Sequence, residues 1–204
     1  MIAPINIAPP QLRSSAVDID RNAALILIDV QQGFDDSGWG HRNNPHAEQI
    51  IALLLDHWRR TGRPVIHVRH DSQADGSALR SGTPGNDFKR EATPIDGEPI
   101  YPKSVNSAFI GTSLEEDLRT RGIATLVIVG LTTNHCVSTT ARMAGNLGFE
   151  TLVVSDATAT FDRVGIDGRL RDAEDVHAAA LSDLDGEFAT VVESSALLVQ
   201  PREK

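Results

Sequence analysis

Three residues with chemically reactive side chains each follow an apolar stretch of this chain. Asp29 comes after LILI, Lys103 after IYP, and Cys136 lies shortly beyond the run ATLVIVG. A carboxylate can take the proton of a thiol, and an ammonium stabilises the resulting thiolate. A base, a cation and a nucleophile together are what covalent attack on a carbonyl requires.

Cys136 is the only cysteine in 204 residues, which excludes an intrachain disulfide and a CxxC zinc site. The segment GLTTNHCVSTTARMAGNLGF (130–149) changes from an apolar run to a helical pattern. We therefore expect the thiol at the start of a helix, where backbone amides favour a thiolate and can bind an oxyanion. A buried structural thiol is the alternative that this segment alone leaves open.

Apolar runs alternate with helical patterns along the chain, which predicts βαβ units and a parallel sheet with helices on both faces. Because the carboxyl ends of parallel strands share one edge of the sheet, Asp29, Lys103 and Cys136 are expected to meet there. The predicted strands cover 23–30, 64–70, 100–104, 124–130, 150–158 and 189–194. The predicted helices cover 43–62, the stretch from Cys136 to about 147, 112–122 and 172–184.

The composition narrows the class of protein. A net charge of −9 argues against a nucleic-acid partner, and no apolar window is long enough to cross a membrane. The proline-bearing segment 1–20 reads as an extended arm rather than a signal peptide. We expect a single cytoplasmic domain, 1–204, that acts on a small molecule. The long polar segment 71–99 is expected to be a lid or a subunit contact.

Four segments resemble the isochorismatase-like cysteine hydrolase family, which includes nicotinamidases, N-carbamoylsarcosine amidases and ureidoacrylate amidases. They are LILIDVQQGF (25–34), KSVNSAF (103–109), GLTTNHCVSTTARMAGNLGF (130–149) and SDATATF (155–161). The resemblance covers residues 23–195. It implies a three-layer α/β/α, doubly wound fold with a six-stranded, mainly parallel sheet, and a homodimer or homotetramer.

The resemblance also implies roles for the three residues. Cys136 would be the nucleophile, Asp29 the general base, and Lys103 the residue that positions and polarises them. A cis peptide bond is expected at Leu131–Thr132. The backbone N–H groups of Thr132 and Cys136 would form the oxyanion hole.

The predicted activity is metal-independent cleavage of a C–N bond in a small amide, ureido or carbamoyl compound, through a thioester on Cys136. Nicotinamidases hold a metal with an aspartate and histidines, but here His67 and His70 lie three apart on a predicted strand and so point to opposite faces. We therefore expect neither a metal nor another cofactor. Two alternatives stay open: hydrolysis of a vinyl ether, lactam or ester in the same pocket, or a non-catalytic binding or thiol-redox protein.

Seven residues near the predicted rim of the site are candidates for substrate binding. Aromatic side chains there can pack the apolar part of a ligand, although Phe34, Phe109 and Phe161 can equally belong to the core. The seven candidates are Phe34, Trp39, His70, Asn106, Phe109, His135 and Phe161.

Overall fold

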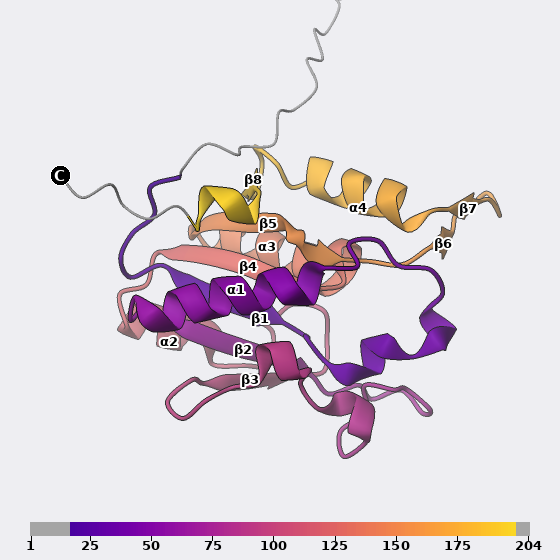
Figure 1. The fold of residues 1–204 in the computed structure, drawn as a ribbon, viewed down its shortest axis with the longest axis horizontal. Helices are drawn as coiled ribbons and strands as arrows, with labels where there is room; N and C mark the ends of the chain where they lie inside the picture. Colours follow the sequence, from indigo (N-terminus) through magenta and orange to yellow (C-terminus); the bar gives the residue numbers. More distant parts are fainter. Residues whose placement is uncertain (1–16, 199–204) are drawn as a thin grey trace, which may run out of the picture.

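A six-stranded parallel sheet forms the centre of the protein (Figure 1). The structure is a computed structural model and describes residues 17–198, so most of the predicted N-terminal arm lies outside the described residues. All six predicted strands are confirmed. In sheet order they are β3 (Ile100–Lys103), β2 (Val65–His70), β1 (Ala24–Ile28), β4 (Thr125–Leu131), β5 (Glu150–Ala159) and β8 (Thr190–Val192).

The strand order identifies where a site can form. From β1 the chain adds β2 and β3 on one side, then crosses over and adds β4, β5 and β8 on the other. The direction of winding therefore reverses between β1 and β4, which are hydrogen-bonded neighbours. In doubly wound sheets the crevice beyond such a switch point is the usual binding site. Asp29 and Cys136 follow these two strands.

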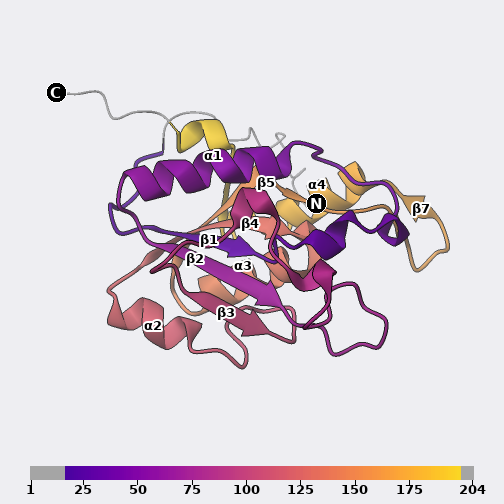
Figure 2. The same ribbon diagram turned by 60° about the horizontal axis from the view of Figure 1, so that its bottom comes forward.

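Helices cover both faces of the sheet, and Figure 2 shows α1 and α2 on opposite sides. The helices are α1 (Ala47–Arg60), α2 (Leu114–Thr120), α3 (Ser138–Asn146) and α4 (Ala173–Ser182). Leu25 and Leu27 of β1 pack into one core with residues of α1, whereas Ile26 and Ile28 pack into a second core with residues of α2, α3 and α4. Both faces of β1 are buried, which explains its continuous apolar sequence.

Several short elements were not predicted. A two-stranded hairpin, β6 (Arg163–Val164) and β7 (Leu170–Arg171), extends from the end of β5. A π-helical turn, η5 (Thr133–Val137), separates β4 from α3. Short 3₁₀ turns complete the loops: η1 (Gln32–Asp35), η2 (Ser37–Trp39), η3 (Pro84–Asn86), η4 (Arg90–Ala92) and η6 (Ser194–Ala196).

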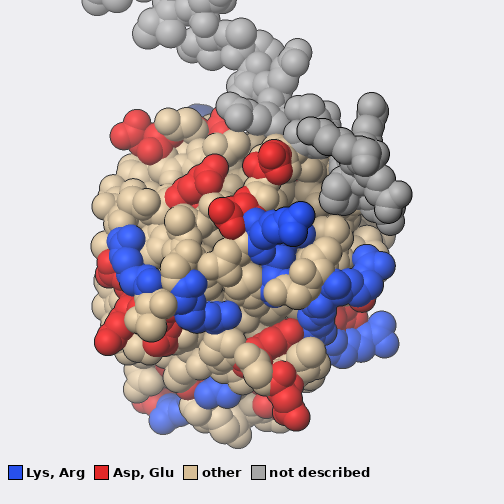
Figure 3. Space-filling model, turned by 90° about the vertical axis from the view of Figure 1, so that its left-hand side faces the viewer, with Lys and Arg blue, Asp and Glu red and all other residues tan. Residues whose placement is uncertain are grey.

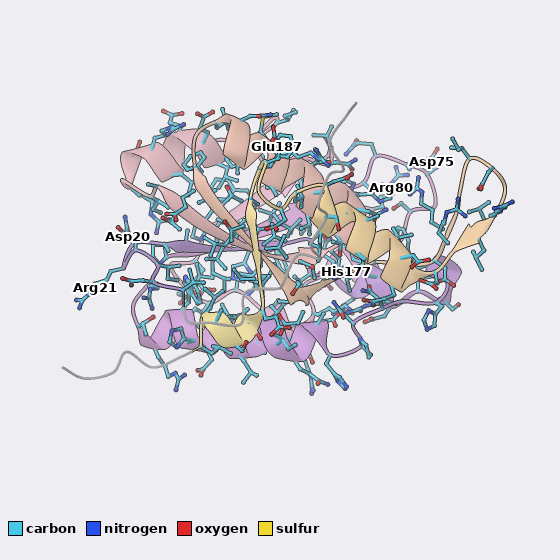
Figure 4. All side chains as sticks on the ribbon, turned by 90° about the horizontal axis from the view of Figure 1, so that it is seen from above. Asp20, Arg21, Asp75, Arg80, His177 and Glu187 are labelled. Atoms are coloured by element: carbon cyan, nitrogen blue, oxygen red, sulfur yellow. The ribbon has the colours of Figure 1, made fainter. Side chains whose placement is uncertain are left out.

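The amino and carboxyl ends of the strands lie at opposite ends of the molecule. Figure 4 shows Asp20 and Arg21, which precede β1, at one end, and Asp75 and Arg80 from the loop after β2 at the other, near the hairpin. On the face in Figure 3, basic and acidic side chains are interspersed rather than gathered into one basic patch. No helix within residues 17–198 is long and apolar enough to span a membrane.

Candidate active site

Asp29 is the first residue after β1, at the switch point of the sheet. Its backbone adopts a left-handed conformation, with φ of 51°, and its N–H donates to Val68 O at 3.0 Å. Aspartate tolerates this region better than most side chains. The turn leaves the carboxylate fully buried, where it needs a partner of opposite charge.

Lys103, the last residue of β3, is that partner, and its ammonium also contacts His70 and Cys136. Its Nζ lies 2.6 Å from Asp29 Oδ2, 3.0 Å from His70 Nδ1 and 3.3 Å from Cys136 Sγ. Asp29, Lys103 and Cys136 are all buried. The predicted convergence of the three strand ends is therefore present in the structure, with the ammonium at its centre.

Cys136 reaches the cluster from the π-helical turn η5. Sequence reasoning placed it at the start of an α-helix, but α3 begins at Ser138. In the turn, Thr132 O accepts from the N–H groups of both His135 and Val137. The Leu131–Thr132 peptide bond is cis, at the position that the resemblance implies. Single π turns of this kind are often found at functional sites.

The surroundings of Cys136 oppose the thiolate more strongly than its sequence position suggests. Burial and the nearby Asp29 carboxylate raise the pKa of Cys136 to about 12, and they outweigh the opposing effect of Lys103. Burial also raises the pKa of Asp29, against the lowering effect of Lys103. A neutral thiol needs a base, and Asp29 Oδ1 is a buried oxygen that has no hydrogen-bond partner among residues 17–198.

His70 completes the contacts of the ammonium. Burial and Lys103 lower the pKa of His70, so the neutral ring accepts a hydrogen bond from Lys103 through Nδ1. Gln31 holds the backbone of His70, since its side chain accepts from His70 N at 2.8 Å and donates to His70 O at 3.1 Å. Sequence reasoning missed Gln31. Its only signal was a polar residue two positions after Asp29.

The donor set at the site bears on the expected absence of a metal. Ligand atoms of Asp29, His70 and Cys136 lie within 4.8 Å of one another. The ammonium of Lys103 contacts all three groups, so a metal cation held by them would lie next to a positive charge. His67 points elsewhere, toward Glu98 at 2.8 Å. These residues suit an ion pair and a nucleophile better than a metal.

Apart from His70, the candidate substrate-binding residues divide into three groups. Asn106 lies beside Cys136, with its Oδ1 3.7 Å from Cys136 Sγ. Phe34, Trp39 and Phe161 form an aromatic cluster, with ring centroids 5.2 to 6.3 Å apart. Phe34 and Phe161 are buried in the core that includes α1, whereas Trp39 is 38% exposed.

Phe109 and His135 make their side-chain contacts outside the cluster of Asp29, Lys103 and Cys136. Phe109 stacks on Phe149 at 5.9 Å between centroids, and Phe149 precedes β5 at the amino edge of the sheet. The ring of Phe109 thus packs near the amino end of β5, and the neighbouring Ala108 N donates to Thr140 Oγ1 of α3 at 3.1 Å. His135 contacts Thr132 Oγ1 and Arg163 rather than the reactive groups.

Part of the long loop is fixed to the body of the protein. Asn86 is buried and donates to His70 O at 2.9 Å, and Lys89 bridges Asp35 and Glu48 at 2.5 and 2.6 Å. The cation of Lys89 is therefore already paired with two carboxylates. Arg90 is exposed and paired with Glu91 at 2.7 Å.

Comparisons with known proteins agree with this geometry. Residues 23–196 match the model of the isochorismatase domain. The chain is 46% identical to the isochorismatase family protein YrdC of Bacillus subtilis over 180 residues, 88% of this chain and 96% of that protein. It is 30% identical to nicotinamidase 3 of Arabidopsis thaliana over 191 residues, 86% of each chain.

The fold comparison gives the same result. A crystal structure from Chromobacterium violaceum, described as a hydrolase of the isochorismatase family, superposes with a TM-score of 0.86 at 46% identity. The match covers 94% of this chain and 97% of that one. Sequence, fold and family model thus agree, and the chain belongs to the isochorismatase family of hydrolases.

Proposed function

We propose that this hydrolase cleaves a C–N bond of a small amide, ureido or carbamoyl compound through a covalent intermediate on Cys136. The observation that carries the proposal is the position of Lys103 Nζ, in contact with both Asp29 and Cys136. A structural thiol needs neither a buried carboxylate nor a buried ammonium. The 30% identity to a nicotinamidase supports an amide as the class of substrate.

The reaction starts from a neutral thiol. Cys136 Sγ bonds to the carbonyl carbon while its proton passes to Asp29 Oδ1, and the carbonyl oxygen becomes an oxyanion. The N–H groups of Thr132 and Cys136 are the proposed donors to that oxyanion. The C=O bond then re-forms, the C–N bond breaks, and the leaving amine takes the proton from Asp29.

Water completes the cycle. It gives a proton to Asp29 as its oxygen attacks the thioester carbon, after which the C–S bond breaks and the proton returns to Cys136. The raised pKa of Asp29 suits this alternation between base and acid. Lys103 holds the carboxylate by its Oδ2, which keeps Oδ1 free for the proton.

A thiol-redox role finds less support. Sensor thiols are exposed and have a lowered pKa. Cys136 is 7% exposed and has a raised pKa.

The test is a panel of small carboxamides, ureido compounds and carbamoyl compounds, with release of ammonia or amine as the readout. We expect Cys136→Ala and Asp29→Asn to lower kcat at least about 10³-fold. A wild-type digest quenched in acid should contain an acyl group on the Cys136 peptide. Asp75→Asn, which changes an exposed carboxylate in the loop after β2, is the control and should keep wild-type turnover.

Two outcomes would contradict the proposal. One is a Cys136→Ala protein that keeps wild-type turnover on a substrate. The other is turnover of a vinyl ether, lactam or ester by the wild type with no cleavage of any amide in the panel. That second result would show that the protein hydrolyses a vinyl ether, lactam or ester instead of an amide.

A further inference from the structure

Consecutive side chains of the turn that carries Cys136 are held by the chain segment after β5. Thr133 Oγ1 lies 2.9 Å from His177 Nδ1 on α4, where His177 is buried (Figure 4). Asn134 Oδ1 accepts from Thr160 Oγ1 at 2.6 Å. These contacts are internal and fix the base of the turn.

The third contact comes from the surface. Arg163, the first residue of β6, is exposed, and its Nη1 donates to His135 Nε2 at 2.7 Å. Arg169 and Arg171 of the same hairpin both pair with Asp167. Arg163 forms no ion pair with an acidic side chain of residues 17–198. Its fixed partner among those residues is a histidine next to the nucleophile.

The chemistry of the two side chains determines where the proton of His135 lies. A guanidinium only donates, so His135 Nε2 must accept from Arg163 at 2.7 Å, a much shorter contact than the 3.5 Å between the same nitrogen and Asn134 Nδ2. Burial and the charge of Arg163 lower the pKa of His135, so the ring is neutral and carries one N–H. That N–H must then be on Nδ1, which lies 3.2 Å from Thr132 Oγ1. A chain of donors runs from Arg163 through His135 to Thr132.

We propose that Arg163 is a positioning residue that selects the Nδ1–H tautomer of His135 and thereby orients Thr132. This inference rests on the proposed function in one respect, because Thr132 N–H is one of the two proposed oxyanion donors. Arg163 then acts on the transition state without touching the substrate. An oxyanion exists only during the reaction, so the effect falls on kcat and not on KM.

The first experiment needs no substrate. Histidine-labelled protein is studied by NMR, where ring nitrogen shifts report the tautomer, and His135→Gln identifies the His135 signals among those of seven histidines. We expect Nδ1–H in the wild type and in the control Arg169→Ala, and a shift toward Nε2–H in Arg163→Ala. An unchanged tautomer in Arg163→Ala would overturn the inference.

The second experiment is a kinetic cycle on whichever amide the panel identifies. We expect Arg163→Ala to lower kcat about tenfold with KM within twofold, which is less than the 10²–10³-fold loss for deleting an oxyanion donor outright. Arg163→Lys, which keeps a donor, should recover part of the loss. In a His135→Ala background, Arg163→Ala should have no further effect.

Each contrary result has its own meaning. A rise in KM alone, or additive losses in the double variant, would show that Arg163 binds the substrate directly and would overturn the positioning role. If the wild type cleaves no amide, the proposed function fails. The NMR experiment then still decides whether Arg163 controls the tautomer of His135.

Discussion

At the scale of single residues, the notable property of the site is that the surroundings of Cys136 raise the pKa of its thiol. Burial and Asp29 act together against the thiolate, and Lys103 only partly compensates. The negative charge that disfavours the thiolate is also the group that can remove its proton. In the proposed mechanism, the thiolate therefore forms only when a carbonyl is ready to be attacked.

Alkylation by iodoacetamide tests this protonation state. With a pKa of about 12, the thiolate fraction of Cys136 rises about tenfold per pH unit from pH 7 to 9, and the alkylation rate should rise with it. Asp29→Asn should speed alkylation at pH 8 while abolishing hydrolysis, because it removes the opposing charge. Lys103→Met should slow it. A rate that is already constant below pH 8 would instead show a preformed thiolate.

The sequence predicted which reactive residues meet, but not how they interact. Strand ends and their order were enough to bring Asp29, Lys103 and Cys136 together. The protonation of the thiol depends on burial, which residue spacing does not report. Gln31 and Arg163 were missed because their partners lie 39 and 28 residues away and are recognisable only once the chain has folded.

At the scale of elements, β4 must approach β1 very closely just before the turn that carries Cys136. Gly130 has φ of 117°, and a Cβ there would lie 2.0 Å from Ile28 O. The neighbouring strand therefore leaves space only for glycine.

We expect Gly130→Ala to cost at least about 3 kcal/mol of unfolding free energy, from backbone strain and the clash with a main-chain oxygen together. Gly122→Ala is the matched control. Gly122 also has a positive φ, 63°, but a Cβ there meets no atom within 4 Å. Gly122→Ala should therefore lower the unfolding free energy by only about 1 to 2 kcal/mol. Urea unfolding of both variants gives the comparison, and equal losses would contradict the close approach.

Elements with a strong periodic pattern were predicted well, and short ones were not. Buried strands such as β1 and β4 are marked by continuous apolar runs. The strands of the β6–β7 hairpin are two residues each, which is too short for an alternation to appear. The π turn was read as the first turn of a helix, because both place polar residues ahead of an amphipathic pattern.

At the scale of the whole molecule, partly buried ion pairs join the loop after β2 to α1 and β2. Glu48 of α1 accepts from both Arg42 and Lys89, and Glu98 accepts from Arg59 and contacts His67. The carboxyl-terminal half of segment 71–99 is thus anchored to the core. The homodimer or homotetramer implied by the resemblance stays a prediction.

These pairs predict how stability depends on pH. Their partners lower the pKa of Glu48 and of Glu98 to about 2, from an ordinary value of 4.5. A lowered folded-state pKa stabilises the folded protein above pH 4.5, and that contribution is lost as the pH falls from 4.5 toward 2. Wild-type unfolding free energy should therefore decrease steeply over this window.

Glu48→Gln removes the carboxylate that pairs with Arg42 and Lys89. Removing one partner of a mostly buried pair should cost about 2 kcal/mol at pH 7, and the variant should lose less stability than the wild type between pH 5 and pH 3. Glu187→Gln, at an exposed carboxylate (Figure 4), serves as the control and should follow the wild-type curve. Urea unfolding at pH 7, 5 and 3 measures all three proteins. Parallel curves for wild type and Glu48→Gln would show that the Glu48 pairs do not set the acid limit of the fold.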